Sequence, residues 1–230
     1  MRLWDKCLTI EAAIGQIGDD ATIMVGGFGV PGTPFCLLDE LVRQGQKRLT
    51  LIKNDANETG MGVDHLLENG QVKKLVVTHI GLNARAIQLM NEKQLEVEFC
   101  AQGILAERIR TAGAGLIGFL TDVGIETELA AGRTRIEFAG RSCLIEKALS
   151  ADFALVHAHQ ADPFGNLIYN ATARNFNPLM AMAADRVIVE TETLVALGEL
   201  SPNAIHTPGP FVDGVVRLPE LTGEYGIVRR

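Results

Sequence analysis

The sequence predicts an α/β fold in which helices flank a mostly parallel sheet, with a small antiparallel hairpin added in the second half of the chain. Short apolar runs of strand length alternate with segments of helical periodicity, as in strand–helix–strand units. The first two apolar runs end in glycine or in polar residues, as buried parallel strands do. The 230 residues contain no low-complexity linker and no repeat, so we expect a single domain over residues 1–230.

In the first half of the chain the two periodicities alternate regularly. Apolar residues recur at helical spacing from residue 10 to 17, which predicts a first helix with Thr9 as its N-cap. Units of this length imply parallel strands with right-handed crossovers. Strands are expected at residues 22–25, 49–52, 75–77 and 97–100, and further helices at residues 35–44, 63–68, 85–92 and 104–110.

The second half has a different texture. Glycines between residues 113 and 124 mark a loop-rich stretch. Two short runs at residues 135–138 and 143–146 predict the antiparallel hairpin, appended to the sheet. Buried strands are expected at residues 153–156 and 187–189, with a helix at residues 178–184 between them.

Composition excludes several classes of protein. Hydrophobic residues make up 47% and charged residues 21%, which is ordinary globular usage and excludes a disordered chain. The formal charge is -7 and Lys and Arg are not clustered, which argues against a nucleic-acid-binding surface. The chain has 24 glycines and only 5% aromatic residues, a composition that favours close backbone approach to a small ligand.

The four cysteines, Cys7, Cys36, Cys100 and Cys143, are far apart and form no Cys-x-x-Cys pair. This spacing predicts neither a metal site nor a disulfide framework, so we expect buried free thiols in a reducing compartment. The N-terminus is charged where a secretory signal would be apolar, and no apolar run approaches the roughly 18 to 20 residues that span a bilayer. We therefore expect a cytoplasmic location.

A glycine-rich loop follows the first expected strand. Gly27, Gly29 and Gly32 form a GxGxxG pattern, and Asp55 stands where a ribose-binding acid would lie in a dinucleotide site. Two prolines flank the last of these glycines and delay the helix to residue 34, with Thr33 as the expected N-cap. From these residues alone, a dinucleotide site and a plain strand-to-helix turn are both open.

Further blocks of sequence extend along almost the whole chain. They are Asp19–Pro34, Gln102–Arg110, Gly113–Gly115, Ala158–His159 with Asp162, Gly165 and Asn166, Ala173–Pro178 and Thr207–Gly209. In this order they resemble the A (alpha) subunit of the family I coenzyme A transferases, of the acetate, acetoacetate and butyrate (3-oxoacid) type. The resemblance implies a Rossmann-like fold of the NagB/RpiA/CoA-transferase kind.

The resemblance also implies an activity, which is the movement of CoA between a short-chain acyl-CoA and a free acid such as acetate, acetoacetate, butyrate or a related 3-oxoacid. In this family a glutamate of the beta subunit carries CoA as a glutamyl-CoA thioester in a ping-pong exchange. The implied partner is therefore a beta subunit in an alpha2beta2 heterotetramer. Coenzyme A or acyl-CoA is implied as substrate, with no permanently bound cofactor. The nearest string here, Glu68–Gly70, lacks the serine of the family's Ser-Glu-Asn-Gly motif and predicts a helix C-cap.

Two parts of a site are implied as well. Gln102 matches the family glutamine beside the catalytic glutamate, where it is expected to donate to the thioester or anhydride oxygen. Backbone amides of the loop are expected to line the CoA side. The loop consists of Gly26, Gly27, Phe28, Gly29, Val30, Pro31 and Gly32. No metal site is expected, since His79, His157 and His159 are interpreted as partnered structural residues, and Asn177 as the N-cap of the following helix.

Three positions depart from the family pattern. Asp20 occupies a turn position that is usually Gly or Asn. A loop of the form TPTGxGT is replaced by Thr121–Thr127, which gains the carboxylates Asp122 and Glu126 and bears on substrate choice if it approaches the acyl pocket. Gln160 replaces a commonly basic residue.

Two other function classes stay open at this point. The Gly27, Gly29 and Gly32 loop would also suit an NAD(P)-dependent oxidoreductase. A non-catalytic metabolite-sensing domain of the same fold is the other class, because a fold does not determine a function.

Overall fold

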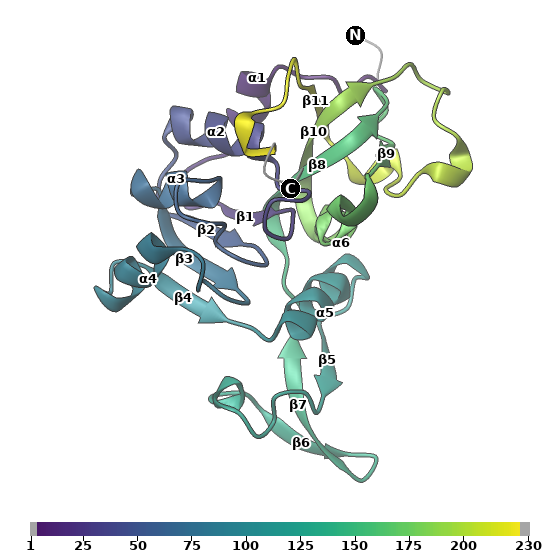
Figure 1. The fold of residues 1–230 in the computed structure, drawn as a ribbon. Helices are drawn as coiled ribbons and strands as arrows, with labels where there is room; N and C mark the ends of the chain where they lie inside the picture. The colour runs from purple at the N-terminus through teal and green to yellow at the C-terminus, as the bar shows by residue number, and fades with distance from the viewer. Residues whose placement is uncertain (1–3, 226–230) are drawn as a thin grey trace.

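The computed structural model describes residues 4–225 and contains a main sheet with helices on both faces (Figure 1). Its strands are β1 (Thr22–Val25), β2 (Leu49–Ile52), β3 (Val72–Val77), β4 (Glu96–Phe99), β8 (Ala151–Ala161), β9 (Leu167–Ile168), β10 (Ala184–Leu194) and β11 (Gly214–Arg217). In the order β11-β10-β8-β1-β2-β3-β4 each neighbouring pair is parallel, and β9 pairs antiparallel with β8. The predicted parallel sheet is confirmed.

Helices occupy both faces of this sheet. The α-helices are α1 (Ile10–Ile14), α2 (Phe35–Gln44), α3 (Val63–Glu68), α4 (Ala84–Asn91), α5 (Gln102–Gly113) and α6 (Asn177–Ala183). Short 3-10 turns are η1 (Glu128–Ala130), η2 (Ala171–Arg174), η3 (Pro202–Ala204) and η4 (Gly209–Phe211). Helices α1 to α4 lie on one side of the sheet, and α5 and α6 lie on the other (Figure 1). None of the helices within residues 4–225 has the length and apolar character to cross a membrane.

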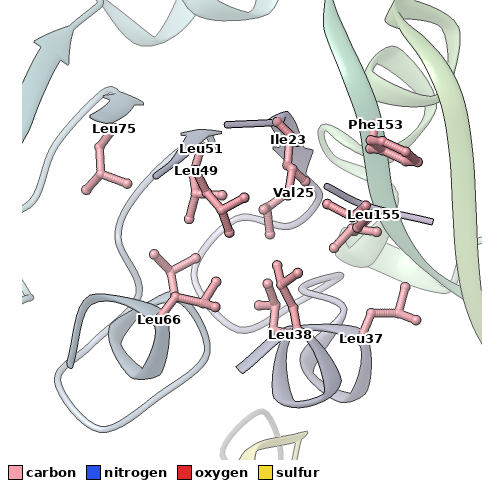
Figure 2. Close-up of a cluster of buried hydrophobic side chains, with 14 of the residues drawn as sticks. Ile23, Val25, Leu37, Leu38, Leu49, Leu51, Leu66, Leu75, Phe153 and Leu155 are labelled. Carbon is pink, nitrogen blue, oxygen red and sulfur yellow. The ribbon is translucent and has the colours of Figure 1, made fainter. Parts of the chain in front are cut away.

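The core follows from the alternation of side chains along each strand. On β1, Ile23 and Val25 point toward α2 and α3, while Met24 belongs to a second cluster under α5 and α6. Figure 2 shows the first cluster, in which Leu38 and Leu66 reach up to the leucines of β2. The central strand β1 is buried on both faces and its sequence is mostly apolar, whereas the edge strand β4 is exposed or half-buried and alternates glutamate with apolar residues.

The predicted hairpin is present, but its attachment was predicted wrongly. β6 (Arg135–Phe138) and β7 (Arg141–Lys147) pair antiparallel through Ala139 and Gly140, both of which have positive φ. They belong to a separate sheet of order β5-β7-β6, whose third strand β5 (Gly118–Thr121) was expected to be loop. This smaller sheet extends away from the main one beyond α5 (Figure 1). Its short strand carries glycine and one threonine, so its pattern was too weak to separate from the glycine-rich stretch.

Two predicted helix caps are also wrong, and one is confirmed. Thr9 Oγ1 accepts from the Ala12 amide at 3.2 Å and caps α1. Thr33 does not cap α2, because its hydroxyl donates to the Gly29 carbonyl at 2.7 Å within the glycine loop. Asn177 is the first residue of α6, not its cap, and its side chain donates to the Gly32 carbonyl at 3.0 Å. In both cases the side chain that was expected to cap a helix is hydrogen-bonded to a carbonyl of the glycine loop.

The cysteines are free, as predicted, but not all are buried. Cys100 and Cys143 are buried, whereas Cys36 is half-buried and Cys7 is exposed. Cys7 lies in a single β-bridge with Val215 at the edge of the sheet, which leaves its side chain open to solvent.

Candidate active site

The glycine loop lies at the topological switch point of the main sheet. It leaves the carboxyl end of β1, which stands between β8 and β2, where the strand order reverses. In open α/β sheets, ligands bind in the crevice outside the carboxyl ends of the strands at this point. The loop residues proposed from sequence are therefore at the expected place for a ligand.

Two glycines of this loop are required by close contacts. A Cβ on Gly26 would stand 1.9 Å from Asn177 Oδ1. A Cβ on Gly32 would stand 2.5 Å from the Ala173 carbonyl, and Gly32 has a φ of +78°. The loop is thus packed tightly against the segment that leads into α6. This packing explains why Asn177 bonds to the loop and not to its own helix.

The loop offers fewer free amides than the sequence suggested. The amides of Gly26, Phe28 and Gly29 donate to Leu155, to Pro31 and to Asp55, respectively, and Pro31 has no N–H. Within residues 4–225 the amides of Gly27, Val30 and Gly32 are left, and of these residues only Val30 is not buried. Phe28 stands at the open tip of the loop with 46% of its surface exposed.

Directly behind the loop, Asp55 holds four hydrogen-bond donors. Its Oδ2 accepts from the Gly29 amide at 2.8 Å and from Asn54 Nδ2 at 2.9 Å. Its Oδ1 accepts from the Asn57 amide at 2.9 Å and from the fully buried Lys53 at 3.2 Å. A carboxylate has about four acceptor positions, so Asp55 has none left for a ribose hydroxyl.

The charge of Asp55 is stabilised by the same partners. Burial alone would raise the pKa of this carboxyl, but Lys53, Asn54 and the two backbone amides outweigh it and lower the pKa to about 2. Burial lowers the pKa of Lys53, and the nearby carboxylate acts in the opposite direction. The two residues form an ion pair in which both side chains are withdrawn from solvent.

Gln102 is connected to the same cluster. It is the first residue of α5, it is exposed, and its Nε2 donates to Asn54 Oδ1 at 2.8 Å. A primary amide has two N–H donors, so one Nε2–H is left without a partner among the described residues. The structure therefore brings the glycine loop and Gln102, which are far apart in sequence, to the ends of one hydrogen-bonded chain.

A small cavity opens beside this chain. Its volume is about 90 Å³, and its lining is Phe28, Gly29, Val30, Asp55, Asn57, Glu58, Met61, His79 and Leu82. The lining combines four apolar side chains, those of Phe28, Val30, Met61 and Leu82, with four polar or charged ones. Such a cavity suits a small organic group with one polar end.

Comparison with known proteins agrees with this geometry. The family model for coenzyme A transferase matches residues 7–218. The chain belongs to the coenzyme A transferase family. It is 49% identical over 218 residues to a protein of Bacillus subtilis named probable coenzyme A transferase subunit alpha, covering 94% of this chain and 95% of that protein. It is 44% identical over 211 residues to the acetate CoA-transferase subunit alpha of Escherichia coli, covering 92% and 96% of the two chains.

The fold is that of solved CoA-transferases as well. An acyl-CoA transferase of Escherichia coli O157:H7 superposes with a TM-score of 0.81 at 23% identity, over 94% of this chain. This chain spans about half of that longer protein, 47% of its length. The predicted family and fold class are thereby confirmed, and the alternative of an oxidoreductase is not supported.

The string Glu68–Gly70 forms the end of a helix. Glu68 ends α3 with an exposed carboxylate that pairs with Arg85 at 2.9 Å. Asn69 is the C-cap of the helix, and Gly70 follows with a φ of 65°. The predicted helix C-cap is confirmed.

The histidines are partnered, as predicted for His157 and His159. His157 bonds to Glu190 at 2.8 Å and to Glu192 at 3.1 Å, and His159 bonds to Glu192 at 3.0 Å. Burial acts to lower the pKa of His157, but the two carboxylates outweigh burial and raise this pKa to about 9. No cluster within residues 4–225 has the ligands for a metal ion. His79 lies in the lining of the small cavity and bonds to Thr78 at 2.9 Å.

The Glu190 side chain was missed by the sequence analysis. It accepts from the Leu37 amide at 2.9 Å, in the first turn of α2, and it also accepts from the hydroxyl of Tyr225. It therefore replaces the cap that Thr33 was expected to provide. An acidic residue within the apolar run of β10 was the signal that could have revealed it.

The departing loop Thr121–Thr127 lies near the start of α5. Val123 and Gly124 line a narrow space together with Ala101 and Ile104. Asp122 is exposed and pairs with Arg141 across the smaller sheet. This places the altered loop on the Gln102 side of the molecule.

Proposed function

We propose that this chain is the alpha subunit of a heteromeric CoA-transferase that moves CoA between a short-chain acyl-CoA and a free acid. Acetate, acetoacetate, butyrate and related 3-oxoacids are the proposed acids, and a beta subunit supplies the nucleophilic glutamate. The single observation that carries the proposal is Gln102, which stands at the carboxyl-end crevice with one amide hydrogen bonded to Asn54 and the other free. The family membership and the name of the Escherichia coli relative support it.

In the proposed reaction the glutamate carboxylate attacks the thioester carbonyl, the C–S bond breaks, and CoA leaves as a thiolate. The thiolate then attacks the glutamyl carbonyl of the resulting anhydride, which releases the first acid and leaves a glutamyl-CoA thioester. A second acid reverses these steps. Each attack places negative charge on a carbonyl oxygen, and the free Nε2–H of Gln102 is the donor we assign to that oxygen.

The glycine loop is assigned to the CoA side of the site. Among the residues of the loop, Val30 alone combines partial exposure with an amide that has no partner between residues 4 and 225, so we assign the backbone donor to Val30. The cavity beside Asp55, with Met61 and Leu82 in its wall, is assigned to the short acyl chain. Its volume of about 90 Å³ suits a short chain and not a long one.

The test is co-expression of the chain with a beta subunit from the adjacent coding sequence. The complex is expected to exchange CoA between acetyl-CoA and butyrate or acetoacetate, while the chain alone is inactive. Mass measurement after incubation with acyl-CoA should find the CoA adduct on a glutamate of the partner. Light scattering of the complex tests the proposed alpha2beta2 stoichiometry.

Two variants make the test specific. Gln102→Ala should assemble normally and lose about 100-fold to 1000-fold in kcat, the loss seen when one oxyanion donor is removed. Glu58→Gln tests for a nucleophile on this chain itself, because Glu58 is an exposed carboxylate in the lining of the proposed acyl cavity. If the chain alone transferred CoA, and Glu58→Gln abolished that transfer, the nucleophile would lie on this chain and the proposal would be refuted.

A further inference from the structure

The buried pair Lys53 and Asp55 is not explained by stability. Lys53 is 0% exposed and Asp55 is 5% exposed, and their nearest charged atoms are 3.2 Å apart. Replacing such a pair with apolar residues of similar volume is often neutral or stabilising, because withdrawing two charges from water is costly. A function other than holding the fold together is therefore the better account of the pair.

The hydrogen bonds of Asp55 lead in two directions. On one side its Oδ2 holds the Gly29 amide at 2.8 Å, at the turn of the glycine loop. On the other side the same oxygen accepts from Asn54 Nδ2 at 2.9 Å. The other oxygen, Oδ1, accepts from the Asn57 amide and from Lys53, so an asparagine at this position would set its NH₂ group against an N–H donor whichever way it faced.

The second bond determines which way the Asn54 side chain points. With its Nδ2 held by Asp55, the amide presents Oδ1 to Gln102, whose Nε2 lies 2.8 Å away. If Asn54 turned over, it would present an NH₂ group to Gln102, and the Gln102 amide would have to turn over as well. The free donor of Gln102 would then be replaced by its carbonyl oxygen.

The Asp55 bonds also fix the loop. Asn57 Nδ2 and the Thr33 hydroxyl donate to the Gly29 carbonyl at 2.9 Å and 2.7 Å, while Asp55 takes the Gly29 amide. The peptide groups on both sides of Gly29 are thus held by buried or half-buried partners. Gly29 has a φ of +61°, and a Cβ placed on it would meet no atom within 4 Å. Hydrogen bonds, and not close packing at this position, therefore hold its conformation.

We propose that Asp55 is a positioning residue, which sets the orientation of Gln102 through Asn54 and the conformation of the glycine loop through Gly29, with Lys53 as its buried counter-ion. This inference rests on the proposed function, in which Gln102 and the loop face the reacting thioester. Asp55 itself touches no substrate in this account. A shift of about 1 Å in a group that contacts the reacting atoms can cost about 100-fold in rate.

The test compares single and double variants in the complex with the beta subunit. Asp55→Asn alone leaves Lys53 buried without its carboxylate and is expected to lower the thermal midpoint. The double variant K53M/D55N removes both charges and should recover stability. We expect the double variant to keep a kcat at least tenfold below wild type, with a smaller change in KM for acyl-CoA.

The matched control is the double variant D64N/R85M. Asp64 is a second fully buried carboxylate, and it pairs with Arg85 at 3.2 Å without any bond to the loop or to Gln102. The D64N/R85M variant should change the thermal midpoint of the complex but leave its kcat at the wild-type value. Full kcat in a stable K53M/D55N complex would overturn the inference, because Asp55 would then have only a structural role.

A nuclear magnetic resonance measurement on the full chain tests the geometry without any activity. The Gln102 Nε2 and Gly29 amide resonances should shift and lose protection from exchange in K53M/D55N, while those of D64N/R85M match wild type. Unchanged resonances would refute the inference. If the wild-type complex shows no transfer, the proposed function fails, whereas the positioning by Asp55 is still decided by these resonances.

Discussion

The buried histidine His157 should make stability fall as pH rises from about 6 to 9. Its side chain is 5% exposed and contacts Glu190 and Glu192 at 2.8 Å and 3.1 Å. These carboxylates outweigh burial and raise the pKa from 6.5 to about 9 in the folded chain. A raised pKa means that the folded state binds the proton more tightly, so the contribution is complete below pH 6.5 and is lost as the pH approaches 9.

The magnitude follows from the shift. A change of about 2.5 pKa units corresponds to about 3 kcal/mol at low pH. Between pH 6 and pH 8.5, titration of this one group should remove about 2 kcal/mol of the free energy of unfolding. Asp39, whose pKa is raised by burial to about 6, also titrates near this range in the folded chain. Cys36 keeps its proton throughout the range when folded, because burial raises its pKa to about 12.

Urea unfolding at several pH values, for wild type and for His157→Gln, isolates the histidine. Contributions from the other groups are present in both proteins and cancel in the difference between the two curves. His159→Gln is measured alongside, because His159 bonds to the same Glu192 at 3.0 Å, so this variant shows what a substitution beside Glu192 does by itself. The difference curve for His157→Gln should fall by about 2 kcal/mol. A flat curve for His157→Gln would refute the reasoning.

Three further substitutions test packing, backbone conformation and surface charge. Leu38→Ala in the cluster of Figure 2 should lower the free energy of unfolding by about 2 to 5 kcal/mol, because Leu38 is 0% exposed. Gly32→Ala should destabilise more than Gly70→Ala in the same assay, since both have positive φ but only Gly32 would meet a backbone carbonyl, at 2.5 Å. Arg141→Ala should change the free energy of unfolding by less than about 1 kcal/mol, because its pair with Asp122 is exposed, and a larger loss would mean that the smaller sheet depends on this pair.

The parallel sheet could be predicted from sequence because its strands and helices carry local patterns. The runs at β1 and β2 are apolar except for one threonine in each, and α2 has one apolar face that packs on them. The smaller sheet was placed wrongly because nothing in the local sequence shows which sheet a hairpin joins. Pairing between β5 and β7 connects residues 118–121 with 144–147, a contact that depends on the whole chain.

The site was harder to predict for a related reason. The glycine loop was found through its GxGxxG pattern and through the family resemblance, and Gln102 through the resemblance alone. Asn54 and Lys53, which connect them, follow an apolar strand and look locally like the start of a loop. Asp55 was identified from sequence as a candidate ribose-binding acid. A bond to the Gly29 amide also requires an acidic residue at this distance from the glycine loop, so the sequence pattern does not separate the two roles. Only the count of its four donors distinguishes the two roles.

The two wrong caps have a common cause that bears on function. A cap is predicted from residues within one turn of a helix, which assumes that the helix start has no other partner. At the start of α2 the partner is Glu190 on β10, and at the start of α6 it is the glycine loop, which holds Asn177. Since both helices give up their local caps to contacts around the loop, the loop is tied to the sheet and to α6 at once. Such a fixed loop holds the half-buried Val30 amide in one position, which suits the CoA-side donor that we propose it to be.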